Sequence, residues 1–159
     1  MPIVCSARLD GRKGTRESLA IAGVARELFV DTSGWYPALV RTNSAHQSVS
    51  AALRDAVREG RRLVTTNLVV AETHALLLSR VGRAPALAFL RAARRAPTVV
   101  VECDPGLEAK ALADWIDRYA DQDFTLTDAV SVAVMAERGI DTALSLDRHF
   151  AVAGFVLTP

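Results

Sequence analysis

Four acidic side chains, far apart in the chain, occupy positions from which carboxylates could act together on a substrate. Asp31 follows the apolar run ELFV, and Asp147 follows ALSL, so each lies at the end of an expected strand. Glu72 lies within LVVAETHALLL, and Asp128 lies in TLTDAVSVAVM. In open parallel sheets, ligands bind beyond the carboxyl ends of the strands, where loops and helix starts converge. We therefore expect these four acids to meet in one cleft.

Each acid also has an interpretation that involves no chemistry. Asp31 and Asp147 fit the general preference of Asp for helix N-caps and loops. Asp128 completes the capping pattern of Thr125-Leu126-Thr127-Asp128. Glu72 has apolar residues three and four positions away on both sides, so we expect its helix face to be in the core. A carboxylate there needs a cation, a proton or strong donors, and an arginine would satisfy it.

The combination of four acids favours a metal site. Clustered carboxylates repel one another, and ligand sets made only of oxygen select Mg²⁺ or Mn²⁺ over zinc. Three histidines, His46, His74 and His149, show no paired metal-ligand spacing, and we expect them to be surface or packing residues. The two cysteines, Cys5 and Cys103, form no paired-cysteine motif and are expected to be inert.

Strands that alternate with helices are expected to position the acids. The expected strands are 27–31, 62–66, 98–103 and 142–146, with 155–159 as an edge strand, and the expected helices are 33–42, 46–60, 68–82, 85–96, 105–119 and 125–139. We expect Ser33 and Asn67 to be N-caps, and the helix 68–82, which is apolar on nearly every side, to be buried. Strands that are continuous apolar runs are typical of a parallel sheet covered on both faces. The sequence therefore predicts an α/β fold with a mostly parallel sheet of four to five strands flanked by helices.

The length of the chain fits a single domain, and its nearly balanced charges produce no large positive electrostatic field. The chain has 159 residues and a formal net charge of +1, although all but two of its nineteen basic residues are arginine. Two arginine clusters could grip phosphates or simply be solvated helix faces: Arg54, Arg58, Arg61 and Arg62, and Arg91, Arg94 and Arg95. No apolar run is long enough to span a bilayer, and no signal peptide is present, so we expect a cytoplasmic protein. Residues 1–25 are expected to be an N-terminal extension.

The segments FVDTSGWY, NLVVAETHALL, DFTLTDAVSVAVM and ALSLDRHF, taken in order, resemble the PIN domain, and most closely the VapC-type toxins of toxin–antitoxin systems. The resemblance implies a three-layer PIN-like fold over residues 26–159. It implies an endoribonuclease dependent on Mg²⁺ or Mn²⁺, usually a homodimer, that is silenced by a VapB-type antitoxin. It assigns Asp31, Glu72, Asp128 and Asp147 to the acidic site, where water attack would leave a 5′-phosphate and a 3′-hydroxyl.

Five further residues are expected near this site. Thr32 and Ser33 match the polar pair that follows the first acid of the family. Asp123 stands where related sequences often carry another acid, and we place it at the rim or in the outer shell. Ser131 forms a small polar patch with the first turn of its helix, and Arg148 is the basic residue nearest the site along the chain. The aromatic residues Trp35, Tyr36 and Trp115 are interpreted as core or dimer contacts rather than base-stacking platforms.

Other classes of protein fit the sequence less well. A phosphatase of the haloacid dehalogenase type needs a second Asp two residues after the first, and that position is Ser33. A serine hydrolase needs a Gly-x-Ser-x-Gly turn, which is absent. The remaining alternative is a PIN-like module that has lost catalysis and acts by binding RNA or protein. The presence of all four acids favours the enzyme.

Overall fold

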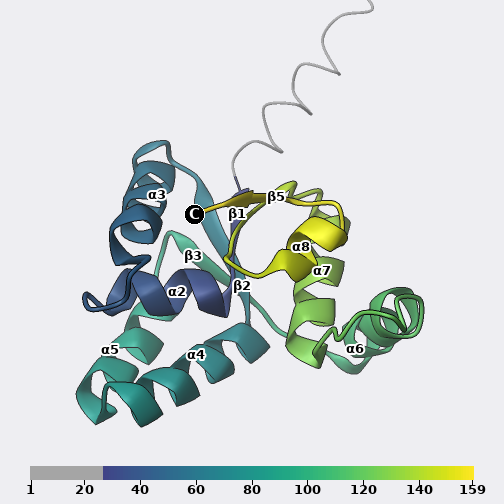
Figure 1. Ribbon diagram of the computed structural model, residues 1–159, viewed down its shortest axis with the longest axis horizontal. Coiled ribbons are helices and arrows are strands. Elements are labelled where there is room, and N and C mark those ends of the chain that lie inside the picture. The colour runs from purple at the N-terminus through teal and green to yellow at the C-terminus, as the bar shows by residue number, and fades with distance from the viewer. Residues whose placement is uncertain (1–26) are drawn as a thin grey trace, which may run out of the picture.

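A single parallel sheet organises the computed structural model, which describes residues 27–159 (Figure 1). Its strands are β1 (Glu27–Val30), β2 (Arg62–Thr66), β3 (Thr98–Val101), β4 (Thr142–Leu144) and β5 (Val156–Thr158), in the order β3-β2-β1-β4-β5. Every neighbouring pair is parallel, so the predicted mostly parallel sheet is confirmed, with 156–158 as an edge strand. The expected extension, residues 1–25, and Cys5 lie outside the described residues.

Helices cover both faces of the sheet. They are α2 (Thr32–Leu39), α3 (His46–Arg58), α4 (Asn67–Arg80), α5 (Arg83–Ala93), α6 (Pro105–Ala111), the π-helix η1 (Leu112–Ile116), α7 (Leu126–Arg138) and α8 (Arg148–Val152). Figure 1 shows α2 to α5 on one side of the strands and α6 to α8 on the other, which gives the expected three layers. Within residues 27–159, no helix has the length and apolar character that crossing a membrane requires.

The caps of two helices differ from the prediction by one or two residues. Asp31, not Ser33, caps α2, and Thr66, not Asn67, caps α4 by accepting a hydrogen bond from the Val69 amide. In both cases the cap is the last extended residue before the helix, and its side chain reaches the free amides. The Asn67 side chain instead accepts a bond from the Cys103 amide at 2.9 Å, which ties the end of β2 to the residues after β3.

Four other elements depart from their expected extents. Helix α5 begins at Arg83, two residues before the proline that was expected to open it. The single helix expected over 105–119 changes to π-helical geometry at Leu112. Residues 148–152 form the short helix α8 where a turn was expected. Strand β4 ends at Leu144, so Asp147 follows a two-residue loop rather than the strand itself.

Helix α4 is less buried than its composition predicts. Val69, Val70, Thr73 and Leu77 are buried, while Leu78 is 47% exposed. The reason is its place in the fold: α4 packs against α2 and α5 in the outer layer and leaves its remaining face to solvent. A hydrophobic pattern alone does not say which layer a helix occupies.

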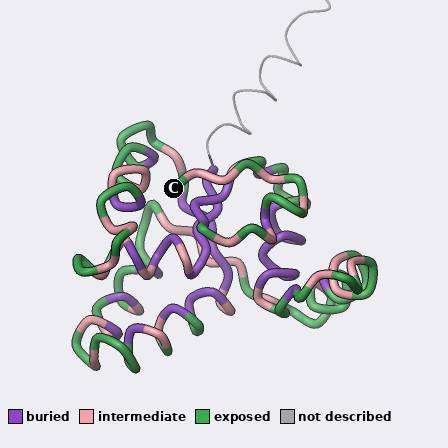
Figure 2. Tube along the Cα trace, viewed as in Figure 1, coloured by how far each residue is buried: buried purple, intermediate pink, exposed green. Residues whose placement is uncertain are grey.

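The apolar core lies between the sheet and its helices, as the buried centre of the trace shows (Figure 2). Phe29, Val64 and Leu144 in the central strands are fully buried, and so are Met135 in α7 and Phe150 in α8. Burial of a side chain of this size stabilises the fold by about 1.5 to 3 kcal/mol. The core therefore holds the ends of β1 and β4 together, where two of the four acids are attached.

A buried ion pair closes the opposite end of the sheet. Glu27 at the start of β1 accepts two hydrogen bonds from Arg138, at 3.0 Å from Nε and 2.8 Å from Nη2, and it also pairs with Arg62. The hydrogen bonds and charge of Arg138, together with Arg62, hold the pKa of Glu27 below its ordinary value of 4.5, although burial opposes this shift. The pair ties the end of α7 to the first strand.

Glu27→Gln is expected to lower the free energy of unfolding by about 1 to 3 kcal/mol at neutral pH, because it leaves two guanidinium groups without their carboxylate. A lowered pKa stabilises the fold in full above the ordinary value of 4.5, and that contribution disappears as pH falls through the lower folded-state pKa. Urea unfolding of both proteins should therefore converge at acid pH. Glu102→Gln, which breaks the exposed ion pair with Arg94, is the control and should lower the free energy of unfolding by less than about 1 kcal/mol. Equal costs for both variants would contradict this role of Glu27.

Candidate active site

A cavity of about 350 Å³ opens beyond the carboxyl ends of β1 and β4. All four acids singled out in the sequence line it: Asp31, Glu72, Asp128 and Asp147. They come from the start of α2, the middle of α4, the first turn of α7 and the start of α8. The structure thus brings together carboxylates that are up to 116 positions apart in the chain.

Three of the acids hold the amino end of a helix with one carboxylate oxygen. Asp31 Oδ2 accepts bonds from the amide and hydroxyl of Ser33 at 3.1 and 2.8 Å. Asp128 Oδ2 accepts the amide and hydroxyl of Thr125 at 3.0 and 2.7 Å, and Asp147 Oδ1 accepts the amide two residues along at 2.9 Å. The other oxygen of each carboxylate accepts no hydrogen bond from residues 27–159. Capping therefore fixes the orientation of each group and leaves one oxygen free for a ligand.

Two serines connect the loops that carry Asp31 and Asp147. Ser145 Oγ lies 3.2 Å from Asp31 Oδ2 and 3.0 Å from the Ser33 hydroxyl, and it accepts the amide of Asp147 at 3.0 Å. Ser33 Oγ also accepts the amide of Leu146 at 2.8 Å. Ser145 is buried, so this network is held away from solvent. Ser145 was not predicted as a site residue, because its only signal is a hydroxyl in the segment TALSL, two residues before an acid.

Gly34 lets the two loops approach this closely. A β-carbon at this position would overlap the backbone oxygen of Leu144, the last residue of β4. The same oxygen accepts the amide of Asp31 at 3.2 Å. The start of α2 therefore rests directly on the end of β4.

The carboxyl group of Asp31 is the most buried of the four. Burial raises its pKa, the hydrogen bonds from Ser33 partly offset this, and the charge of Asp128 adds to it. The cavity therefore disfavours the ionised form of Asp31 as long as no cation is present.

Glu72 lies at the solvent side of the cavity, not in the core as we expected. Its residue is exposed because α4 belongs to the outer layer, and it forms no ion pair with an arginine among the described residues. Partial burial raises its pKa, and the charges of Asp31 and Asp128 raise it further, while the hydroxyl of Thr127 opposes the shift. Partial burial together with the charges of two other acids therefore distinguishes this glutamate.

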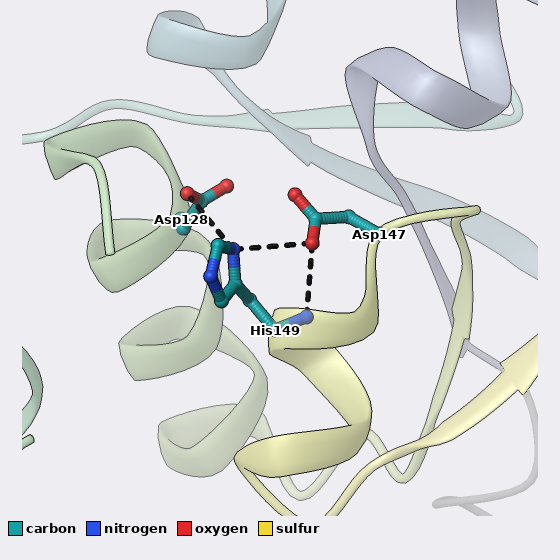
Figure 3. A group of neighbouring side chains, drawn as sticks. All are labelled: Asp128, Asp147 and His149. Atoms are coloured by element: carbon teal, nitrogen blue, oxygen red, sulfur yellow. Dashed lines mark hydrogen bonds and ion pairs between the residues drawn. The ribbon is translucent and has the colours of Figure 1, made fainter. Parts of the chain in front are cut away.

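His149 joins the acids, although we interpreted it from sequence as a surface or packing residue. Figure 3 shows its ring between two of them: Nδ1 lies 3.1 Å from Asp147 Oδ1 and 3.8 Å from Asp128 Oδ2. This buried nitrogen makes no hydrogen bond of normal geometry with residues 27–159, and the ring packs against Phe124 at 5.0 Å. The signal in the sequence is its position two residues after Asp147, which becomes a contact only once α8 forms.

Of the other polar residues expected near the site, Thr32 and Ser33 line the cavity, and Asp123, Ser131 and Arg148 do not. Asp123 and Arg148 are exposed, and Arg148 forms no ion pair with a described residue. The Ser131 hydroxyl is buried and donates to a carbonyl of its own helix at 2.6 Å, so it offers no free group.

The basic residue that lines the cavity is Arg80, at the end of α4. None of the arginines in the two clusters expected to form a phosphate-binding rim lies in this lining. No sequence pattern distinguishes Arg80 from the other arginines, because its position at the cavity depends on how α4 packs.

The donor set fits a divalent cation. Asp128, Asp147 and His149 each offer one donor atom, and these atoms lie within 4.8 Å of one another. Ligands on opposite sides of an ion bound at about 2.1 Å are about 4.2 Å apart, so this spacing is close to that of the ligands of a single ion. Thr32 Oγ1 is also buried without a hydrogen-bond partner among residues 27–159. Free carboxylate oxygens, two raised carboxyl pKa values and an unpartnered hydroxyl together indicate a site for a cation.

Comparison with known proteins identifies the family. The family model of the PIN domain matches residues 28–156. The chain belongs to the PIN-domain family. The 23S rRNA-specific endonuclease VapC20 of Mycobacterium tuberculosis, in strains CDC 1551 / Oshkosh and ATCC 25618 / H37Rv, is 37% identical over 133 residues, which cover 81% of this chain and 95% of the relative.

Two solved structures share the fold of this PIN domain. The crystal structure of Mycobacterium tuberculosis VapC20, described as a sarcin-ricin loop cleaving toxin, matches with a TM-score of 0.75 at 30% identity, over 83% of this chain and 99% of that chain. The FitAcB structure from Neisseria gonorrhoeae matches with a TM-score of 0.61 at 13% identity, over 83% and 96% of the two chains. At that identity the second match supports the fold alone.

Glu72→Gln is expected to stabilise the metal-free PIN domain at neutral pH by up to about 1 kcal/mol, because it removes one of several repelling charges. A raised carboxyl pKa means that the wild type loses stability as pH rises from 4.5 through the higher folded-state value, and the variant avoids that loss. Thermal unfolding in EDTA and in Mn²⁺ measures both effects, and Mn²⁺ should stabilise the wild type more than the variant. The exposed Glu108→Gln is the control, and a similar gain there would contradict the prediction.

Ser145→Ala is expected to weaken binding of Mn²⁺ about 10-fold or more, because it removes hydrogen bonds that orient Asp31 and the Asp147 loop. Ser131→Ala is a matched control, since that serine is equally buried but bonds only within its own helix. Isothermal titration calorimetry with Mn²⁺ compares the two variants. If both lose affinity to the same extent, the serine network does not position the acids.

Proposed function

We propose that this chain is a metal-dependent endoribonuclease that hydrolyses RNA phosphodiester bonds, and the toxin of a toxin–antitoxin pair. The observation that supports this most directly is the convergence of four carboxylates in one cavity of a PIN domain, three of them with an oxygen left free. VapC20, a relative at 37% identity, is a 23S rRNA-specific endonuclease. By that relationship, an exposed loop of ribosomal RNA is the proposed substrate.

The proposed cofactor is Mg²⁺ or Mn²⁺, held by Asp31, Asp128 and Asp147 with His149 beside them. Carboxylate oxygens suit both ions, and an imidazole nitrogen is accepted more readily by Mn²⁺ than by Mg²⁺. When bound, such an ion supplies positive charge next to the scissile phosphate and lowers the pKa of a bound water. In this assignment, the principal ligands are the free carboxylate oxygens of the three aspartates that cap helices.

In the proposed reaction, Glu72 orients the attacking water and accepts its proton. Its position at the solvent side of the cavity and its raised pKa suit a general base. The oxygen of water forms a new bond to phosphorus, and the bond to the 3′ oxygen breaks. The products are a 5′-phosphate and a 3′-hydroxyl, which takes a proton from solvent. The 2′-hydroxyl of the RNA is not the nucleophile.

We also propose that the protein is a cytoplasmic homodimer controlled by a VapB-type antitoxin that inserts a segment into the cavity. These partners follow from its membership in the PIN family and its similarity to VapC20. The open side of the cavity, bordered by Glu72 and Arg80, is where such a segment would enter.

Cleavage of defined RNA hairpins tests the enzymatic proposal. The purified chain is incubated with a hairpin that carries the sarcin-ricin loop, in Mn²⁺ and in EDTA. Asp31→Asn and Asp128→Asn are each expected to reduce cleavage by more than about 100-fold, since even outer-shell partners of a metal contribute 10- to 100-fold. Asp123→Asn is the matched control, because that acid lies outside the cavity lining and should retain activity.

Unchanged cleavage in both active-site variants would contradict the metal mechanism. A wild type that binds RNA but cleaves neither this hairpin nor total RNA would favour the alternative, a PIN-like module that acts by binding.

A further inference from the structure

We propose that Arg80 and Tyr36 form a nucleotide-binding subsite beside the acids, specific for unpaired RNA. In this subsite the guanidinium of Arg80 binds a phosphate that flanks the scissile one, and the ring of Tyr36 stacks on an unpaired base. The inference rests on the proposed function, because it takes RNA to be the polymer in the cavity, and it adds the residues that select single-stranded substrate.

Arg80 lies on the face of α4 that faces the cavity. Glu72, Leu76 and Arg80 are four residues apart from one to the next, and all three line the same cavity. Residues at this spacing share one face of a helix. At 1.5 Å per residue, Arg80 is about 12 Å along the helix from Glu72. It is therefore placed to reach a phosphate that flanks the one next to the acids.

The charge of Arg80 is not used within the fold. Four arginines are engaged by carboxylates: Arg58 by Asp55, Arg62 and Arg138 by Glu27, and Arg94 by Glu102. Others, such as Arg83 and Arg148, are also unpaired among residues 27–159, but they do not line the cavity. Arg80 forms no ion pair with any residue of 27–159, and no other basic residue lines the cavity. An exposed arginine at the last turn of a helix also interacts favourably with the helix dipole, which is its purely structural role. A phosphate ligand gives it a second role, since guanidinium binds phosphate through two parallel hydrogen bonds.

Tyr36 also lines the cavity, from helix α2. We interpreted Tyr36 from sequence as a core or dimer contact, and it does pack against the core, but less completely than its neighbour Trp35. Trp35 is buried and packs on Phe89 at 5.8 Å, whereas Tyr36 is half-buried, lines the cavity and pairs with no other aromatic ring of the described chain. Its hydroxyl makes no hydrogen bond with residues 27–159. An aromatic ring in this position provides a stacking surface of the kind that RNA-binding proteins use for unpaired bases.

The size of the cavity favours an unpaired nucleotide over a duplex. A volume of about 350 Å³ is at the lower end of small-molecule sites, and helices α2 and α4 form part of its wall. Bases inside a duplex are stacked on their neighbours and cannot lie against Tyr36 unless they leave the helix. The subsite therefore selects loops and single strands.

Equilibrium binding of RNA without cleavage tests this proposal. The full chain with Asp31→Asn, in EDTA, is titrated into a fluorescein-labelled, unstructured RNA octamer, and anisotropy is measured over a range of salt concentrations. Adding Arg80→Gln is expected to weaken binding about 10-fold and to reduce the salt slope by about 0.7, the contribution of one phosphate contact to a single strand. Arg83→Gln, on the neighbouring helix and outside the cavity lining, is the matched control and should change neither quantity.

Tyr36 is tested in the same assay with two variants. Tyr36→Ala is expected to weaken binding about 5- to 100-fold, the range for loss of one base–aromatic stack. Tyr36→Phe keeps the ring and should bind as well as the parent. A blunt-ended RNA duplex of eight base pairs, which has no unpaired bases, should bind equally weakly to the parent and to Tyr36→Ala.

The proposal is overturned if Arg80→Gln matches Arg83→Gln in affinity and salt slope, or if Tyr36→Phe loses as much as Tyr36→Ala. Thermal unfolding of each variant confirms that the fold is retained. Cleavage of RNA by the wild type in Mn²⁺ is measured separately. Cleavage without an effect of Arg80 or Tyr36 contradicts the subsite alone, whereas a wild type that neither cleaves nor binds RNA contradicts the proposed function as well.

Discussion

Repulsion between carboxylates that face one cavity is the constraint on which this site depends. The fold opposes it by placing Asp31, Asp128 and Asp147 at the amino ends of three helices, where backbone amides and the positive end of the helix dipole stabilise negative charge. Each aspartate gives one oxygen to its helix and keeps the other free. Glu72 has no such support, and its pKa is raised by partial burial and, in addition, by the charges of Asp31 and Asp128. In the proposed function, a bound divalent cation would neutralise the negative charge that the helix ends leave unbalanced.

The hydrogen bonds between these acids and their helices explain why each acid can have a structural role and a functional role at the same time. Thr125 and Asp128 form a complete capping box, as their spacing predicts. That box turns the Asp128 side chain toward the cavity, so capping is the means by which the acid is positioned. Asp31 and Asp147 follow the same pattern at α2 and α8. A capping role is therefore no argument against a role in the active site when several capping acids converge on one cavity.

The sequence predicted the sheet and the convergence of the acids, because apolar runs and strand-end acids are local patterns. It did not predict the partners that depend on packing. Ser145 and His149 flank Asp147 in the chain, but they reach Asp31 and Asp128 only when the β4–α8 loop closes on α2 and α7. The exposure of Glu72 was likewise set by the layer that α4 occupies. Periodicity identifies the faces of a helix, but it does not identify which face meets a cavity.

An anionic site that acts on an anionic polymer needs attraction from outside its own acids. A net charge of +1 does not provide a general field for this, and several arginines are already engaged in structural ion pairs. The attraction must therefore be local: a cation among the acids and a free guanidinium at the edge of the cavity. Arg80 is the lining residue that meets the second requirement. Because both attractions act over a short range, they favour a substrate whose phosphates can enter the cavity, which a flexible loop can do and a rigid duplex cannot.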